Sequence, residues 1–210
     1  MSLSTKKKII SAALKLFNQD GMVNVRLQHI ADEAFVSIGN MAYHYPNKEA
    51  ILLKIYEDLT KRQDEVLTEY RVVPLFDNID RLLHQTFELQ QAFVFFYLDT
   101  LEILRAYPAI GQTHRQRIQA QIFQLKSIIE FNVSRGALKT ELREGVFEKL
   151  ASQLWMTIDF WREQQAVRTT ENLDVEEFKS AIWNLFIPHF TNMGKQEYEQ
   201  MLQHPYDFFL

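Results

Sequence analysis

The apolar residues of this chain recur at intervals of three and four positions along almost its whole length. In residues 5–19 this spacing places Ile9, Ala13 and Phe17 on one side of a helix, and Gly21 follows as a residue that ends helices. No segment shows the strict alternation of apolar and polar residues that is typical of a half-buried strand. Gly and Pro number only 6 and 5 among 210 residues, which favours long uninterrupted helices. The sequence therefore predicts an all-α protein.

Further helices are predicted from residue 48 onward. They span residues 48–70, 75–89, 92–105, 109–134, 144–168, 174–192 and 194–202. The segment 92–105 is apolar on most of its sides, which predicts a helix that is buried all round. Asp174 is followed three residues later by Glu177, and this spacing predicts a capping box at the start of a helix.

Two short helices are predicted at residues 25–34 and 37–45. The second begins at Ser37, whose hydroxyl can cap the first helical turn. Pro46 ends it, and Asn47 can cap the long helix that follows. Two short helices joined by a turn of three or four residues form a helix-turn-helix, in which the second helix enters the major groove of DNA.

The second of these short helices is too polar and too short to build a core. It carries Asn40, Tyr43 and His44, and Gly39 lets a surface approach its backbone closely. The amide of Asn40 has the donor and acceptor that pair with adenine in the major groove. This helix is therefore predicted to face a polar partner.

The net charge of −4 is unevenly divided along the chain. Residues 1–48 contain six Lys and Arg residues against three acids, a balance of +3. The remaining residues contain 17 against 24, a balance of −7. The basic excess thus lies on the segment that is expected to meet phosphate groups.

The first quarter of the chain also carries a distinctive set of residues. They are Ala12-Ala13, Phe17, Gly21, Ile30-Ala31, Val36-Ser37, Gly39-Asn40, Tyr43-His44-Tyr45 and Asn47-Lys48-Glu49. With these residues at these spacings, residues 5–55 resemble the TetR family of bacterial transcriptional repressors. The chain departs from the family at Phe35, where Gly is usual, and at Arg26, where Thr or Ser is common.

The resemblance implies a three-helix helix-turn-helix DNA-binding domain at residues 1–55. A long helix is expected to join it to a helical ligand-binding and dimerisation domain at residues 56–210. The implied function is that of a homodimeric repressor, released from a palindromic operator in double-stranded DNA by a small apolar or amphipathic ligand. The residues expected to contact DNA are Thr5, Lys6, Arg26, Ser37, Ile38, Gly39, Asn40, Tyr43, His44 and Lys48.

Aromatic residues are abundant in the second predicted domain. They can form a core or line an apolar ligand cavity, and the residues predicted to line it are Phe87, Phe96, Tyr97, Phe123, Phe131 and Trp155. The two long helices at 144–168 and 174–192 carry more apolar surface than one interface needs, which favours a four-helix dimer contact over a deep core. The residues predicted for this contact are Trp155, Ile158, Trp161, Phe178, Ile182 and Phe186.

Several other classes of function lack their sequence signals. The chain has no Cys, its six His show no HExxH spacing, and it has neither a Gly-rich phosphate loop nor a nucleophile elbow. We therefore expect no metal, no cofactor and no catalytic residue. No apolar run approaches the ~20 residues that span a bilayer, and no secretory signal is visible, so a cytoplasmic protein with no membrane partner is expected.

Two alternatives remain open from the sequence. An all-α small-molecule-binding or enzymatic protein, or a helical adaptor, would account for residues 75–210. Neither alternative accounts for the polar, Gly-containing helix at residues 38–44.

Overall fold

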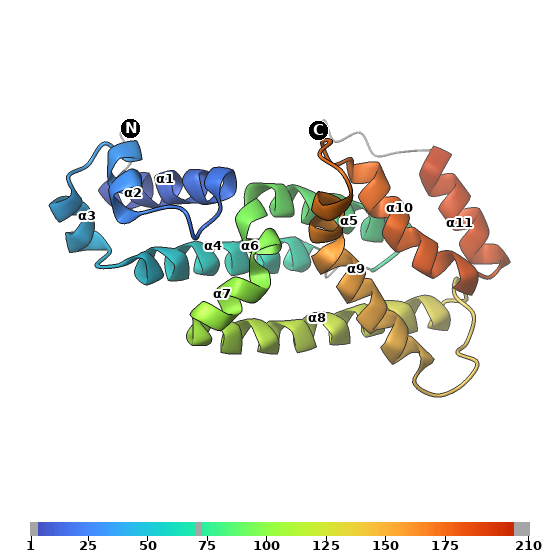
Figure 1. Cartoon of the computed structure of the whole chain (residues 1–210). Coiled ribbons are helices and arrows are strands. Elements are labelled where there is room, and N and C mark those ends of the chain that lie inside the picture. Colours follow the sequence, from blue (N-terminus) through green and yellow to red (C-terminus); the bar gives the residue numbers. More distant parts are fainter. Residues whose placement is uncertain (1–3, 70–72, 204–210) are drawn as a thin grey trace. The chain divides into compact units, whose positions relative to one another are not determined.

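The computed structural model describes residues 4–69 and 73–203, and within these residues the chain is helical (Figure 1). The helices are α1 (Thr5–Asp20), α2 (Leu27–Glu33), α3 (Ile38–His44), α4 (Lys48–Glu69), α5 (Phe76–Ala92), α6 (Val94–Leu98), α7 (Thr100–Ala106), α8 (Pro108–Ser134), α9 (Val146–Arg168), α10 (Val175–Phe186), the 3-10 turn η1 (Ile187–His189) and α11 (Asn192–Gln203). The all-α prediction is confirmed. The predicted end of the fourth helix at Tyr70 lies outside the described residues.

The chain folds into two compact units that are not continuous in sequence. The first, which we call the head unit, comprises residues 1–65 and 89–114, and the second unit comprises residues 66–88 and 115–210. The predicted division after residue 55 follows chain order, whereas the contacts assign residues 89–114 to the head unit.

The core of the head unit joins the helix-turn-helix to α6 and α7. Ile9 and Phe17 of α1, Ile30 of α2 and Met41 of α3 are all buried completely. The ring of Phe17 lies 5.3 Å from that of Phe95 on α6. This core fixes α2 against α1, and α3 against α2 (Figure 1).

A single side chain of α1 holds the bend between α5 and α6. The Asn18 amide nitrogen donates a hydrogen bond to the Ala92 carbonyl at 3.0 Å, and its oxygen accepts one from the Phe95 N–H at 3.1 Å. Helix ends leave such backbone groups unpaired, so Asn18 satisfies two groups that the bend would otherwise leave without partners.

The predicted single helix at residues 92–105 is wrong. The backbone breaks at Asp99, which separates α6 from α7, and Leu98 and Leu101 are exposed, so the segment is not buried all round. The break lets Phe95 and Phe96 turn into the head core, where the ring centres of Phe96 and Tyr56 are 5.4 Å apart. No Gly or Pro marks this break in the sequence, so the apolar pattern alone could not reveal it.

The second unit has an aromatic core between α5, α9, α10 and α11. The ring centres of Phe76 and Trp183 are 5.2 Å apart, and those of Phe87 and Phe178 are 5.6 Å apart. α9 and α10 lie side by side (Figure 1) and direct their apolar stripes into this core. The predicted helix at residues 174–192 is too long, because α10 ends at Phe186 and Pro188 lies in the 3-10 turn that follows.

Two charged clusters tie the helices of the second unit together. The Lys179 ammonium lies 2.8 Å from Asp80, and the Trp183 indole N–H donates to the other oxygen of Asp80 at 2.8 Å. Burial opposes the charge on Lys179, but its hydrogen bonds to Asp80 and Glu176 outweigh burial and raise its pKa. At the other cluster, Glu197 of α11 pairs with Arg135 at 2.6 Å.

Candidate functional site

Local capping shapes the helix-turn-helix as the sequence predicted. The Ser37 hydroxyl accepts a hydrogen bond from the Asn40 N–H at 3.1 Å and so begins α3. The Asn47 side chain accepts one from the Ala50 N–H at 2.8 Å at the start of α4. Both predicted caps are confirmed. Asp174 also caps α10, but it accepts from the Glu176 N–H at 3.0 Å rather than from the Glu177 N–H, so the predicted capping box with Glu177 is wrong.

α3 is anchored by one buried side chain and exposes the rest of its surface. Met41 is completely buried, whereas Ile38 is 43% and Tyr43 is 84% exposed. Gly39 and Asn40 are exposed, and a Cβ atom built at Gly39 would meet nothing within 4 Å. The fold itself therefore does not need Gly at this position, so the open space is available to a partner.

Four more of the residues predicted to contact DNA lie at three places in the head unit. Arg26 is exposed just before α2, where its backbone N–H donates to the His29 ring nitrogen Nδ1 at 3.3 Å. Thr5 is half-buried and Lys6 is exposed in the first turn of α1. His44 is half-buried at the end of α3, with its ring 5.2 Å from that of Tyr43.

Lys48 lies at the first position of α4 but turns its side chain toward the head core. Its ammonium nitrogen is 3.5 Å from the Val23 carbonyl oxygen and 5.8 Å from the centre of the Phe17 ring. Burial lowers the pKa of Lys48, and the negative charge of Glu102 acts in the opposite sense. Lys48 therefore supports the fold of the head in addition to any contact with phosphate.

Phe35, in the turn between α2 and α3, has an unusual conformation. Its φ is +55°, the only positive value among the described non-glycine residues, and its side chain is 93% exposed. The left-handed region costs a residue with a side chain about 1–2 kcal/mol relative to the helical region. The sequence indicated Phe35 only as a departure from a usual Gly, and neither its strain nor its exposure was predicted.

The aromatic residues predicted to line a ligand cavity do not gather in one place. Phe96 and Tyr97 are core residues of the head unit. In the second unit Phe87 packs between Trp161 and Phe178, and Trp155 packs against Phe160 with ring centres 5.7 Å apart. Phe123 is 71% exposed on α8, so its assignment to a buried pocket is wrong. Aromatic composition alone did not distinguish core, surface and cavity.

Phe131 does line a cavity of about 250 Å³ within the second unit. The cavity lies against the end of α4, the start of α5 and the second half of α8. Its lining residues are Leu67, Pro74, Asn78, Ile79, Leu82, Gln124, Ser127, Ile128 and Phe131. The lining is mostly apolar, with two amides and one hydroxyl and no ionisable side chain, so it suits an uncharged guest.

Four of the six residues predicted for a dimer contact lie inside the second unit. Trp161, Phe178, Ile182 and Phe186 are buried in its aromatic core, so their assignment to a surface contact is wrong. Trp155 and Ile158 are half-buried on α9. The apolar surface of these two helices is wide because it meets α5 and α11 of the same chain.

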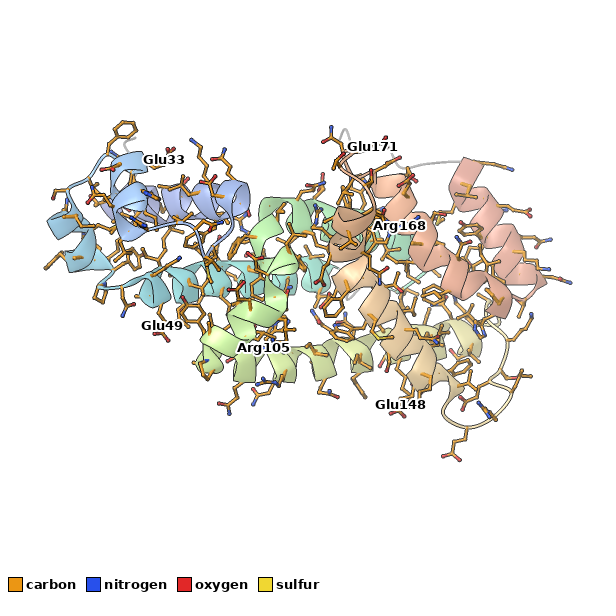
Figure 2. All side chains as sticks on the ribbon, in the orientation of Figure 1. Glu33, Glu49, Arg105, Glu148, Arg168 and Glu171 are labelled. Carbon is orange, nitrogen blue, oxygen red and sulfur yellow. The ribbon has the colours of Figure 1, made fainter. Side chains whose placement is uncertain are left out.

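The second half of α9, the loop that follows it and α10 line a polar groove of about 770 Å³. Arg168 is the last residue of α9 and Glu171 lies in the loop just after it (Figure 2), and both line this groove. Ser180, Ala181 and Asn184 of α10 line it as well.

Asp159 on α9 is an ionisable group that the sequence did not single out. Burial raises the pKa of its carboxyl group to about 7, and the indole of the neighbouring Trp155 acts in the opposite sense. Among the described residues, no group of three or more His, Asp or Glu side chains could hold a metal ion. None of the described helices is both long enough and apolar enough to cross a membrane.

The geometry of α2, the turn and α3 is that of a helix-turn-helix DNA-binding head. Comparison with known proteins gives the family. Residues 9–55 match the model of "Bacterial regulatory proteins, tetR family", and residues 56–198 match that of "Bacterial transcriptional repressor" of the TetR type. The chain belongs to the TetR family and is a DNA-binding transcriptional regulator rather than an enzyme.

Individual relatives are similar over different parts of the chain. The HTH-type transcriptional regulator RutR of Escherichia coli is 42% identical over 59 residues, which is 28% of each chain. A TetR-family regulator from Marinobacter aquaeolei has a TM-score of 0.83 and 22% identity, with 96% of this chain and 99% of that chain covered. A regulator from Saccharomonospora viridis, solved in complex with choline, has a TM-score of 0.68 and 22% identity, with 88% and 95% covered.

Proposed function

We propose that the protein is a homodimeric repressor that binds a palindromic operator and leaves it when a small ligand binds. The single observation that carries the DNA-binding part is α3, a capped helix with one buried side chain and an otherwise exposed surface. Such a helix contributes little to a core, whereas it fits the major groove, which is about 12 Å wide. The family supports both the dimer and the ligand.

The residues of the head divide between base reading and backbone contact. Ile38, Gly39, Asn40 and His44 are proposed to face base edges, with the Asn40 amide pairing with adenine. Thr5, Lys6, Arg26, Ser37, Tyr43 and Lys48 are proposed to contact the sugar-phosphate backbone and set the register. The exposure of Lys6 and Tyr43 supports this assignment.

The cavity that contains Phe131 is proposed as the ligand site. Its apolar lining with Asn78, Gln124 and Ser127 supports a small uncharged ligand that is apolar or amphipathic. The Saccharomonospora relative was solved with choline, which supports small-molecule binding as such. Because choline is a cation and this cavity has no acidic lining, a different ligand is proposed here.

Release from DNA requires that the ligand bind one conformation better than another. A ligand with equal affinity for both conformations would shift nothing, however tightly it bound. Leu67, which lines the cavity, belongs to α4, the same unbroken helix that begins at Lys48 beside α3. We therefore propose that α4 transmits the change from the cavity to the head.

Selection of bound DNA from a random pool with the full chain tests this function. The expected result is an enriched palindrome with half-sites about 34 Å, one helical turn, or slightly more apart. Absence of any enriched sequence would contradict the proposal. A reporter gene placed behind the selected operator then measures the sign of regulation, and repression is expected.

Sedimentation of the unmodified protein tests the dimer. A dimer at micromolar concentration is expected, with the exposed surface of α9 and α10 as the proposed contact. A monomer that still binds one half-site tightly would contradict both the dimer and the half-site spacing.

A further inference from the structure

Phe35 has two features that the fold of this chain does not explain. Its backbone occupies the left-handed region at φ +55°, which favours Gly and disfavours a residue with a side chain. Its ring is 93% exposed, so it gains almost nothing from burial within the chain. For the isolated protein, Gly at this position would be as good or better. Strain that is retained at an exposed aromatic residue indicates a role outside the chain.

Phe35 lies close enough to α3 to reach the DNA groove that α3 is proposed to occupy. It lies two residues before Ser37, which caps α3, and three before Ile38, the first residue of that helix. Three peptide units span at most about 11 Å between Cα atoms. The major groove is about 12 Å wide, so a ring at residue 35 stays in or at the rim of the groove that holds α3.

The charges around Phe35 decide which part of the DNA it can meet. Asp32 and Glu33 lie close by in sequence and are acidic, and they are engaged with Gln28 at 2.8 Å and with Lys15 at 2.6 Å. These carboxylates disfavour a close phosphate, and a Phe ring has no hydrogen-bond donor to offer one. Ile38, the first residue of α3, is a second exposed apolar side chain near Phe35 in the sequence.

We propose that Phe35 is a specificity-determining residue that packs against the apolar surface of the operator at the N-terminal end of α3. The favoured contact is the methyl group of a thymine, since apolar side chains read this group in the major groove. The carbon atoms of a deoxyribose are the other apolar surface within reach. This inference rests on the proposed function, because it requires α3 to occupy the groove.

The test uses the operator that the unmodified full chain selects from a random pool. Phe35→Gly and Phe35→Asn both accept the left-handed backbone and both remove the ring. Each is expected to bind this operator about tenfold more weakly, a change equal to about 1.4 kcal/mol, while its thermal midpoint stays the same or rises. Phe35→Leu, which keeps an apolar side chain, is expected to retain most of the affinity.

Replacing each thymine of the operator in turn by uracil identifies the contact. If Phe35 packs on one thymine methyl, uracil at that base weakens the unmodified protein but leaves Phe35→Gly unaffected, because the two changes remove one interaction. If no uracil has this effect while Phe35→Gly still binds weakly, the ring packs on deoxyribose. The first outcome supports the role of Phe35 in specificity, and the second overturns it, because a sugar contact carries no sequence information.

Leu142→Gly is the matched control. Leu142 is 99% exposed in the loop before α9, so its removal should leave operator affinity unchanged. The inference is overturned if Phe35→Gly and Phe35→Asn bind the operator as tightly as the unmodified protein. A change in sedimentation of these variants without loss of affinity would assign the ring to a protein contact instead. If the unmodified protein selects no operator, the proposed function itself fails, and that result is independent of the variants.

Discussion

α3 and α10 both begin at a capping side chain, yet the surfaces they bury are very different. α10 turns Phe178, Ile182, Trp183 and Phe186 into the core of the second unit. α3 buries only Met41, and its other side chains are exposed except for half-buried His44. A helix with a full apolar stripe holds the fold together, whereas a helix held by a cap and one anchor offers a surface. Substitutions on α10 should therefore change the stability of the protein, and substitutions on α3 should change its affinity for DNA.

The largest effect is expected from a charge at the centre of the α10 stripe. Ile182 is 1% exposed, so Ile182→Asp should lower the free energy of unfolding by about 4 kcal/mol or more, because it buries an unpaired carboxyl group. Chemical denaturation followed by circular dichroism measures this loss. Ser180→Gln, on the exposed side of α10, should change stability by less than about 0.5 kcal/mol. An unchanged unfolding midpoint for Ile182→Asp would contradict the buried position of this residue.

The next effect concerns the buried partner of Lys179. Asp80→Ala removes the carboxylate that pairs with Lys179 and accepts the Trp183 indole N–H, and should cost about 3 kcal/mol of stability. Glu176 also pairs with Lys179 at 2.8 Å but is largely exposed. Glu176→Ala should therefore cost only about 0–1 kcal/mol. Equal losses in the two variants would show that burial does not distinguish these pairs.

Asp159 predicts a dependence of stability on pH. Its pKa of about 7 in the folded chain lies above the value near 3.9 expected for the unfolded chain. The folded state therefore holds the proton more tightly, so the stability contribution is present below pH 4 and is lost as the pH rises through 7. Asp159→Asn should be stabilised relative to the unmodified protein by about 2 kcal/mol more at pH 7 than at pH 5. Thermal melts at the two pH values measure this gain, and parallel melts would refute the shifted pKa.

A smaller and more local effect is expected on α3. Asn40 is exposed, so Asn40→Ala should leave the thermal midpoint nearly unchanged. It should relax the preference for one base pair of the operator by about 1–3 kcal/mol, since a side-chain amide discriminates adenine by about this amount. Binding to single-base operator variants measures the change. Loss of the folded head would instead assign Asn40 a structural role through its N–H bond to Ser37.

Substitution of Lys48 should affect both DNA affinity and the stability of the head. Lys48→Ala should lower the slope of log affinity against log salt by about one unit, as expected for one lost phosphate contact. It should also reduce stability by about 0.5–1 kcal/mol, because the ammonium lies over the Phe17 ring. Lys48→Arg is the matched variant that keeps the charge and should keep the slope. If the slope of Lys48→Ala is unchanged, Lys48 acts only within the head.

Local chemistry was the part of this structure that the sequence predicted well. The caps at Ser37, Asn47 and Asp174 each depend on a side chain and an N–H group two or three residues away, so short-range patterns were sufficient. The spacing of apolar residues in α1 to α4 likewise predicted the helix-turn-helix. Its proposed DNA contacts remain predictions.

Long-range packing was the part that the sequence could not give. The stripe of α10 was assigned to a second copy, although Phe76 and Phe87 of the same chain cover it, because periodicity shows a face but not what covers that face. The break at Asp99 was missed because it depends on Phe95 and Phe96 entering the head core. The cavity next to Phe131 is lined mainly by aliphatic residues from three separated segments, which an aromatic search could not bring together.

The Asn18 amide has a consequence for how the head can loosen. The Asn18 side chain is hydrogen-bonded to both the Ala92 carbonyl and the Phe95 N–H. If α1 moves away from this bend, both backbone groups lose their partner and must be hydrated or stay unsatisfied. An unsatisfied buried group costs about 1–3 kcal/mol, so solvent must enter the bend in the same event. The exchange of the Phe95 amide hydrogen with deuterium therefore reports this opening directly. The exchange rate of this amide therefore measures how often α1 separates from the bend, in the absence of both DNA and ligand.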